Sequence, residues 1–178
     1  MNKISVIMSA FNCENTIEKS INSILNQTYE NFEFLIADDN STDHTSEIIK
    51  NMKKNDSRIM FYQNTKNIGL TKSLNKLLSI SSGSFIARQD ADDVSMNHRL
   101  ETQLAKLNEL DLDFITSRAQ IIGSERLIPG FTFNFPTSFD TTGIKMRIIN
   151  AGGVSNYSET ISRYTWVISV RWKISTNI

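Results

Sequence analysis

Short apolar runs alternate with helix-period stripes along the first two thirds of this 178-residue chain, and this alternation constrains the fold most strongly. Apolar runs rich in Ile, Val and Phe are typical of buried strands, and they predict strands at residues 4–9, 32–37, 59–62, 85–88 and 114–116. Apolar residues spaced three and four apart mark one face of a helix, and they predict helices around residues 17–25, 48–52, 70–78 and 100–110. The alternation predicts an α/β fold, with a mostly parallel sheet and helices on both faces.

Capping residues are predicted where two of these helices begin. Asn15 and Glu18 have the spacing of a capping box for the first helix, with Asn12 as a rival cap. The Ser-Thr-Asp run at 41–43 offers three candidate caps for the second helix.

Composition and charge fit one compact domain and exclude some partners. The chain is 39% hydrophobic and 21% charged, with 19 basic and 19 acidic residues. With no net charge, a protein that coats nucleic acid is disfavoured, so no nucleic-acid partner is expected. Residues 1–120 hold 13 basic and 16 acidic residues, whereas residues 121–178 hold 6 basic and 3 acidic ones. The second part also has weak periodicity, so we expect two regions of different character.

The cysteine, histidine and hydropathy patterns bear on cofactor and compartment. Cys13 is the single cysteine, so it forms no internal disulfide, which is consistent with a reducing compartment. Two histidines, His44 and His98, leave little room for a zinc site built from His and Cys. No run of about 20 mostly apolar residues predicts a transmembrane span, and the apolar run at 4–8 lacks the length of a signal peptide.

Clustered carboxylates follow one predicted strand. Asp90, Asp92 and Asp93 lie within four positions, directly after the strand at 85–88. Like charges this close repel one another, and a hard divalent cation with oxygen ligands, Mg²⁺ or Mn²⁺, would neutralise them. The alternative is a solvated loop in which Ser95 or Asp93 caps the next helix.

Further candidates follow other strands, because ligands in parallel α/β sheets bind beyond the carboxyl ends of the strands. Asp38 and Asp39 could accept hydrogen bonds from a ribose or a base, or the polar run after them could simply cap a helix. Phe11 could cover a base or be a core aromatic residue. The Asn-Ile-Gly run at 67–69 precedes a helix whose N-terminus would attract phosphate. Lys72 in its first turn could add positive charge or be merely solvated.

These blocks together resemble the family 2 glycosyltransferases, which have the GT-A fold. The resemblance is carried by SVIMSAFNCENTIEKSINSILNQTYENFEFLIADDNSTDHTSEII, then NIGLTKSLNKLLSISSGSFIARQDADD, then RLETQLAKL. It covers about residues 3 to 118, and it is specific because separate blocks occur in order and at the right spacing.

The resemblance implies an inverting, metal-dependent transfer of a sugar from a nucleotide-diphosphate donor to a saccharide or lipid-linked acceptor. Asp90 and Asp92 match the Asp-x-Asp that holds Mg²⁺ or Mn²⁺ on the diphosphate, and Asp39 matches the residue that holds the base or ribose. The implied nucleotide-sugar-binding residues are Ser9, Ala10, Phe11, Asp38, Asp39, Lys72, Asp90 and Ala91. Family members often build surface polysaccharides at the inner face of the membrane, which implies cytoplasmic work with peripheral membrane contact.

The C-terminal region departs from the family pattern. An inverting enzyme needs a carboxylate base, but the usual Glu-Asp pair is absent, and only Glu125, Asp140 and Glu159 remain after Asp113. The Gln-x-x-Arg-Trp motif of some members is also absent, because Ile168 stands in the Gln position. We therefore expect a nucleotide-sugar-binding domain at 1–120 and a remnant of the acceptor half at 121–178. Its atypical tail starts at about residue 151, as in a truncated or frame-shifted product.

Three alternative functions remain open. The first is a catalytically dead remnant that binds a nucleotide sugar or nothing, in keeping with the missing base. The second is a sugar-phosphate nucleotidyltransferase, which would need a Gly-rich basic loop after the first strand. The third is a nicotinamide dehydrogenase, disfavoured because no Gly-x-Gly-x-x-Gly follows any strand.

The run at 164–167 could touch a membrane or form a buried strand. The sequence leaves the donor sugar, acceptor and linkage open.

Overall fold

The computed structural model describes residues 2–111, 114–117, 146–150, 153–154 and 168–171. The predicted strands and helices are confirmed within a few residues at each end. The elements of the first 117 residues are β1 Ile4–Ala10, α1 Ile17–Leu25, β2 Phe32–Asp38, α2 Thr45–Asn55, β3 Ile59–Gln63, α3 Leu70–Ile80, β4 Phe85–Arg88, α4 Arg99–Glu109 and β5 Phe114–Ser117. Three more strands follow: β6 Met146–Asn150, β7 Gly153–Val154 and β8 Ile168–Arg171. The run at 164–167 lies outside the described residues.

The strands form one eight-stranded sheet in the order β3-β2-β1-β4-β8-β5-β6-β7. β1 is parallel to both β2 and β4, and β2 is parallel to β3, so the first four strands form the expected parallel core. β8 is antiparallel to both β4 and β5 and joins them. Because β1 lies between β2 and β4, the carboxyl ends of these three strands meet at one edge.

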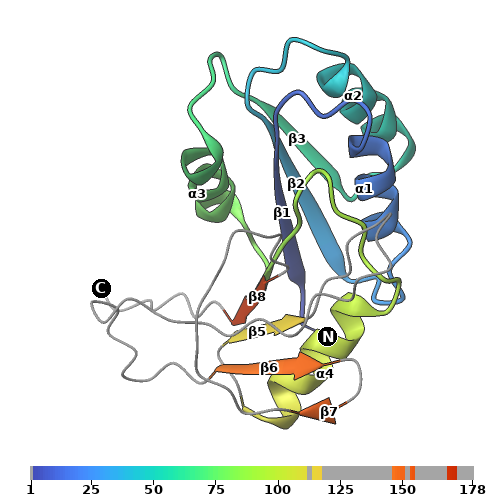
Figure 1. The fold of residues 1–178 in the computed structure, drawn as a ribbon, viewed down its shortest axis with the longest axis vertical. Helices are drawn as coiled ribbons and strands as arrows, with labels where there is room; N and C mark the ends of the chain where they lie inside the picture. Colours follow the sequence, from blue (N-terminus) through green and yellow to red (C-terminus); the bar gives the residue numbers. More distant parts are fainter. Residues whose placement is uncertain (1, 112–113, 118–145, 151–152, 155–167, 172–178) are drawn as a thin grey trace.

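Apolar side chains cover both faces of the sheet, as their alternation along each strand requires. In β1, Val6 and Met8 belong to a large cluster on one face, and Ile7 belongs to a smaller cluster on the other. The large cluster includes the buried stripes of α1, α2 and α4, whereas Leu77 of α3 packs in the smaller one. Figure 1 shows α3 on one side of the sheet and α1 and α2 on the other. Helices therefore cover both faces, as expected.

The predicted capping box is wrong. Thr16, not Asn15, is the N-cap residue of α1, and no side chain among the described residues caps this helix in that way. Asn12 instead adopts a positive φ of 47° and joins the loops after β1 and β2. For α2 the N-cap residue is His44, so the prediction of a cap at residues 41–43 is also wrong. Asp43, the residue before this cap, accepts a hydrogen bond from the N–H of Thr45 on its Oδ1 at 3.0 Å.

A buried carboxylate fastens the opposite, amino-terminal edge of the sheet. Glu33 in β2 accepts hydrogen bonds from Lys3 Nζ at 2.7 Å, from Ser5 Oγ at 2.6 Å and from the backbone N–H of Ser82 at 2.7 Å. Burial of the Glu33 carboxyl raises its pKa, but these hydrogen bonds outweigh burial and lower the pKa to about 2. Glu33 thus links the starts of β1, β2 and β4, away from the strand ends that carry the candidate residues.

Replacing Glu33 by Gln is expected to lower the free energy of unfolding by about 2 kcal/mol at neutral pH. Because the folded pKa of Glu33 lies below its usual 4.5, its contribution is present above about pH 4.5 and is lost as the pH falls toward 2. Urea unfolding at several pH values measures both effects. Equal stability of the two chains at neutral pH would contradict this role.

Candidate functional site

The predicted site residues do meet at the carboxyl edge of the sheet. Ala10 at the end of β1 is in register with Asp38 at the end of β2, and its carbonyl accepts the N–H of Asp39 at 2.8 Å. On the other side of β1, the N–H of Gln89 donates to the carbonyl of Ile7 at 3.0 Å, directly after β4. The segments that follow these strands therefore lie next to one another at this edge, and they contain residues 9–11, 38–39 and 90–93.

We call residues 90–93 the acidic loop. Asp92 is exposed, and Asp90 and Asp93 are partly buried. Arg88, the last residue of β4, donates to both oxygens of Asp90, from Nε at 2.8 Å and from Nη2 at 3.0 Å. Arg88 is a charge partner that the sequence pattern did not indicate.

A buried glutamine organises the backbone of the acidic loop. The Gln89 side chain is fully buried, and its Nε2 donates to the carbonyl of Asp93 at 2.9 Å. Its Oε1 accepts a hydrogen bond from Ser95 Oγ at 2.7 Å. Ser95 therefore supports Gln89 and does not cap α4, whose N-cap residue is His98. The alternative prediction, in which Ser95 or Asp93 caps this helix, is therefore wrong.

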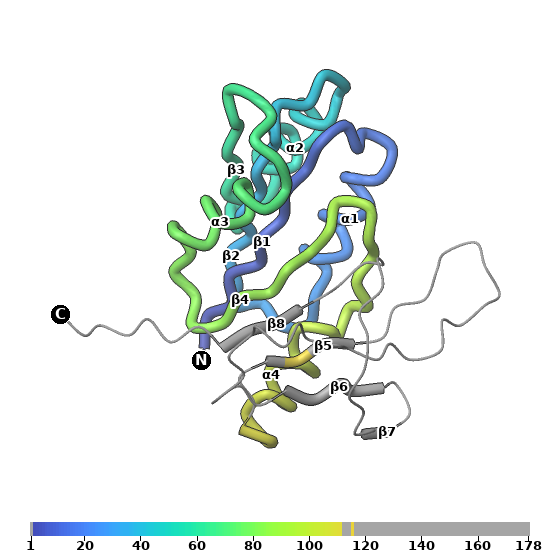
Figure 2. The backbone as a smooth tube through the Cα atoms, turned by 60° about the vertical axis from the view of Figure 1, so that its left-hand side comes forward, coloured from blue at the N-terminus to red at the C-terminus, as the bar shows by residue number. Residues whose placement is uncertain are grey.

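Residues of α1 and of the turn after it hold the segment between β4 and α4. Ser20 Oγ donates to the carbonyl of Asp90 at 2.9 Å, and Gln27 Nε2 donates to the carbonyl of Met96 at 2.7 Å. Gln27 Oε1 accepts a hydrogen bond from the N–H of Leu100 at 2.9 Å. Figure 2 shows the segment between β4 and α4 running alongside α1. The fold thus holds the acidic loop in place through several independent contacts.

Burial and mutual repulsion disfavour ionisation within the acidic loop. Burial raises the pKa of Asp93, and the neighbouring charges of Asp90 and Asp92 raise it further, to about 6. Burial also raises the pKa of Asp90, against the opposing effect of Arg88. Arg99 at the start of α4 is buried, which lowers its pKa to about 9, and its Nε has no hydrogen-bond partner among the described residues. Burial thus opposes ionisation of both partly buried carboxylates of the loop, Asp90 and Asp93.

Replacing Asp93 by Asn is expected to stabilise the metal-free chain by about 1–2 kcal/mol at pH 7.5. The folded pKa of Asp93, about 6, exceeds its usual 3.8, so stability falls as the pH rises through this interval. Asn cannot ionise, so the variant should lose this part of the pH dependence. Thermal unfolding in EDTA between about pH 4 and pH 8 tests it; parallel curves for the two chains would contradict the assignment.

Asp38 and Asp39 lie next to each other but have different partners. One oxygen of buried Asp38 accepts hydrogen bonds from the N–H and Oγ of Ser41, whereas its Oδ2 has no partner among the described residues. Asp39, also buried, accepts the N–H groups of Ile68 at 2.9 Å and Gly69 at 2.7 Å. Asp39 therefore anchors the loop that precedes α3, a role that the sequence did not indicate.

Asn64 completes the network around Asp39. Its Nδ2 donates to Asp39 Oδ1 at 2.8 Å and to Ser73 Oγ at 2.9 Å. Burial raises the pKa of Asp39, but the hydrogen bonds from Ile68, Asn64 and Gly69 outweigh burial and lower it. Asp39 is thus held as a carboxylate, with acceptor capacity beyond these bonds.

Reciprocal hydrogen bonds fasten the loops after β1 and β2 to each other. The N–H of Asn12 donates to Ser41 Oγ at 3.0 Å, and Asn12 Oδ1 accepts the N–H of Thr42 at 2.8 Å. The N–H of Glu14 donates to Asp43 Oδ2 at 3.1 Å. Both loops are therefore ordered where they border the candidate site.

The remaining predicted residues differ in exposure. Phe11 is 48% exposed, so it is not a core aromatic residue of the described part of the chain. Ser9 is partly buried, and Ala10 and Ala91 are buried. Lys72 is exposed in the first turn of α3, after the loop that Asp39 anchors. The possible bases Glu125, Asp140 and Glu159 lie outside the described residues.

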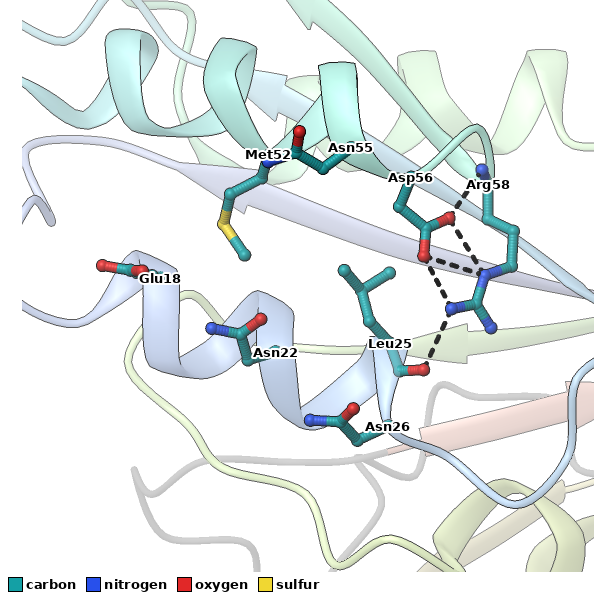
Figure 3. A pocket seen from close by; sticks show the side chains of 8 residues that line it. All are labelled: Glu18, Asn22, Leu25, Asn26, Met52, Asn55, Asp56 and Arg58. Carbon is teal, nitrogen blue, oxygen red and sulfur yellow. Dashed lines mark hydrogen bonds and ion pairs between the residues drawn. The ribbon is translucent and has the colours of Figure 1, made fainter.

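A shallow pocket of about 340 Å³ lies elsewhere, between α1, α2 and the turn before β3 (Figure 3). Asn22, Asn26 and Asn55 line it, together with an ion pair in which Arg58 Nη2 donates to Asp56 Oδ2 at 2.7 Å. None of the predicted site residues lines this pocket. It therefore serves as a control region for the experiments below.

The acidic loop fits a cation that is shared with a ligand. The described residues contain no group of three His, Cys, Asp or Glu side chains placed to hold a metal together. Asp90 and Asp92 nevertheless offer hard carboxylate oxygens, and Asp93 lies beside them in the same loop. Mg²⁺ is usually bound by one or two carboxylates plus waters and substrate phosphates. The donor set thus suits a dication that also binds a diphosphate.

The fold is an α/β fold whose polar strand ends lie together at the carboxyl edge of its parallel sheet. Residues 5–160 match the model of Glycosyl transferase family 2. The chain belongs to this family, and the match extends beyond residue 118, where the resemblance in the sequence ended.

Relatives of known name are longer than this chain. EpsE of Bacillus subtilis (strain 168) is 49% identical over 108 residues, which are 60% of this chain and 39% of EpsE. The UDP-Glc:alpha-D-GlcNAc-diphosphoundecaprenol beta-1,3-glucosyltransferase WfgD of Escherichia coli is 36% identical over 128 residues, 72% of this chain and 50% of WfgD. The chain therefore spans half or less of the length of these relatives.

Solved structures share the fold. S. aureus TarS 1-349 in complex with UDP-GlcNAc has a TM-score of 0.65 and 28% identity, over 75% of this chain and 38% of that one. The mannosyltransferase PcManGT from Pyrobaculum calidifontis, in complex with GDP-Man and Mn²⁺, has a TM-score of 0.61 and 20% identity, over 66% of this chain and 35% of that one. At this identity the PcManGT likeness concerns the fold alone. The expected α/β fold of the GT-A type is confirmed. Among the described helices, none is long and apolar enough to cross a membrane.

Proposed function

We propose that this chain binds a nucleotide-diphosphate sugar at the carboxyl edge of its sheet and takes part in transfer of the sugar to a saccharide or lipid-linked acceptor. The observation that carries the proposal is the acidic loop, whose three carboxylates are held beside the ends of β1 and β2 by hydrogen bonds from Ser20 and Gln89. Membership of Glycosyl transferase family 2 supports the same conclusion.

The nucleotide is proposed to lie over Ser9, Ala10 and Phe11, where the exposed ring of Phe11 can stack on a base. Asp38 Oδ2, a buried acceptor without a donor, would be satisfied by a base N–H or a ribose hydroxyl. Asp39 orders the loop before α3 and retains capacity to accept one more hydrogen bond.

The diphosphate is proposed to lie between the acidic loop and the start of α3. Lys72 and the N-terminus of α3 favour negative charge there, and Ala91 lies in the same loop as Asp90 and Asp92. Asp90 and Asp92 would hold Mg²⁺ or Mn²⁺, which when bound supplies Lewis-acid stabilisation of the leaving diphosphate. We propose an inverting reaction, in which a carboxylate base outside this donor site deprotonates the acceptor.

The acceptor side is assigned to a separate region. We propose that residues 1–120 hold the donor and that residues 121–178, atypical from about residue 151, belong to the acceptor half. WfgD acts on a diphosphoundecaprenol-linked saccharide, and by analogy we propose a lipid-linked acceptor in surface polysaccharide synthesis. We also propose that this work takes place in the cytoplasm at the inner face of the membrane, with peripheral contact. The dead-remnant alternative is not favoured, because residues 5–160 match the model of Glycosyl transferase family 2.

A donor screen tests the proposal. Melting temperatures are measured with a panel of UDP-, GDP- and dTDP-sugars, each in Mn²⁺ and in EDTA. A ligand at 100 times its dissociation constant stabilises the folded state by about 2.7 kcal/mol, which corresponds to a rise of several degrees. We expect one nucleotide class to give this rise in Mn²⁺ and a much smaller rise in EDTA. No rise with any donor would contradict the proposal.

A further inference from the structure

Arg88 forms a bidentate ion pair with the carboxylate of Asp90. Both oxygens of Asp90 accept a hydrogen bond from the guanidinium, at 2.8 Å and 3.0 Å. The Arg88 and Asp90 side chains remain 25% and 18% exposed, so ions in solution can reach the pair. A cation that uses Asp90 therefore meets a carboxylate that already has a charged partner.

The backbone of the acidic loop does not depend on this ion pair. The carbonyl of Asp90 accepts hydrogen bonds from Ser20 Oγ at 2.9 Å and from the N–H of Asp93 at 3.2 Å. Gln89 Nε2 donates to the carbonyls of Asp90 at 3.3 Å and Asp93 at 2.9 Å. The side chain of Asp90 can therefore exchange its partner while the main chain stays in place.

We propose that Arg88 is a placeholder cation, which occupies Asp90 until a divalent cation and a nucleotide diphosphate bind together. This inference rests on the proposed function. When both ligands bind, Asp90 releases Arg88 to hold the dication, and the freed guanidinium donates to the diphosphate. A guanidinium suits both partners, because its planar fork pairs with carboxylate and phosphate oxygens alike.

The formal charges explain why the two ligands would bind together. Asp90, Asp92 and Asp93 against Arg88 and Arg99 leave a formal charge of −1, and one dication changes it to +1. A dication alone displaces Arg88 without giving it a new partner. With the diphosphate present, the displaced guanidinium regains two acceptors. Arg88 thus weakens binding of the cation alone and strengthens the coupling between cation and nucleotide, which is reciprocal by linkage.

The test measures Mn²⁺ binding to the full chain by electron paramagnetic resonance of free Mn²⁺, with and without UDP. Arg88→Gln is expected to bind Mn²⁺ alone about five- to tenfold more tightly than the wild type, because the competing ion pair is gone. The factor by which UDP increases Mn²⁺ affinity is expected to fall at least about fivefold. Arg88→Lys, which keeps the charge without the fork, should lie between the two.

Arg58→Gln is the matched control. Arg58 and Asp56 form the same two-pronged pair at the same i, i+2 spacing, beside the pocket of Figure 3 and apart from the acidic loop. Its loss removes one positive charge in the same way, so it should leave both Mn²⁺ affinities within about twofold of the wild type. A change equal to that of Arg88→Gln would mean that net charge alone is measured, and would overturn the inference.

The outcomes separate this inference from the proposed function. If UDP increases Mn²⁺ affinity in the wild type but Arg88→Gln binds Mn²⁺ alone equally or more weakly, the placeholder role is overturned and the donor site stands. If neither chain binds Mn²⁺, with or without UDP, both are overturned. Should Arg88→Gln fail to fold, Arg88→Lys decides: tighter binding of Mn²⁺ alone supports the inference, and unchanged or weaker binding overturns it.

Discussion

Replacing Asp92 by Asn should reduce the affinity for UDP in Mn²⁺ at least about thirtyfold, while leaving the affinity in EDTA unchanged. Asp92 is the exposed carboxylate of the acidic loop, and its partner in the proposed metal site, Asp90, is paired with Arg88 in the described structure. The variant keeps the shape of the side chain but removes half of the formal negative charge that Asp90 and Asp92 offer to the cation. Calorimetry of UDP binding in Mn²⁺ and in EDTA measures the effect.

Glu109→Gln is the control for this prediction. Glu109 is an exposed carboxylate at the end of α4 that pairs with Lys106 at 2.6 Å, so its substitution removes the same charge away from the acidic loop. The control should bind UDP like the wild type in both conditions. Unchanged Mn²⁺-dependent binding in Asp92→Asn would remove Asp92 from the metal site.

Replacing Asp39 by Ala should both destabilise the chain and weaken binding of uridine. The loss leaves the N–H groups of Ile68 and Gly69 without their acceptor, so the free energy of unfolding should fall by about 2–4 kcal/mol. Because the proposed contact is to base or ribose, uridine affinity should fall at least about tenfold without metal. Urea unfolding and uridine calorimetry at a temperature where the variant is folded measure the two effects.

Asn64→Ala separates the two roles of Asp39. Asn64 donates to Asp39 Oδ1 at 2.8 Å, so its loss disturbs the same network but keeps the carboxylate. This variant should lose about 1–2 kcal/mol of stability and keep uridine affinity within about threefold of the wild type. If Asp39→Ala binds uridine as Asn64→Ala does, Asp39 only anchors the loop before α3 and does not contact the nucleotide.

The strands and helices of the first 117 residues could be predicted from the sequence because apolar spacing is a local property. The alternation in β1, with Val6 and Met8 on one face and Ile7 on the other, follows directly from the pleat. Ligands of parallel sheets bind at the carboxyl ends of the strands, and this rule predicts that the polar runs after β1, β2 and β4 lie together. These runs do lie at one edge.

The partners of the site residues could not be predicted, because they come from distant segments. Asp39 accepts hydrogen bonds from residues 64–69, and Gln89 depends on Ser20 and on Ser95. One signal was available: Ser20 is a polar residue beside the apolar stripe of α1, Gln27 follows the end of this helix, and both prove to be buried. Buried polar residues at such positions need a partner, and the partner is the segment between β4 and α4.

Helix starts were the least predictable feature. The capping box expected at Asn15 and Glu18 rested on residue types alone, yet the helix starts one residue later than such a box requires. Asn12 and Asp43 instead fasten the loops after β1 and β2 to each other. Contacts between loops that are about thirty residues apart therefore decided the local geometry.

The most direct test of the proposed function is to locate UDP on the chain by NMR. Amide chemical shifts of the ¹⁵N-labelled protein are recorded while UDP is added in Mg²⁺. We expect the largest changes at residues 9–12, 38–41 and 88–93, and almost none at residues 22–26 and 52–58, which border the other pocket. Changes centred on residues 22–26 and 52–58, or no changes with UDP in Mg²⁺, would contradict a nucleotide-sugar site at the carboxyl edge of the sheet.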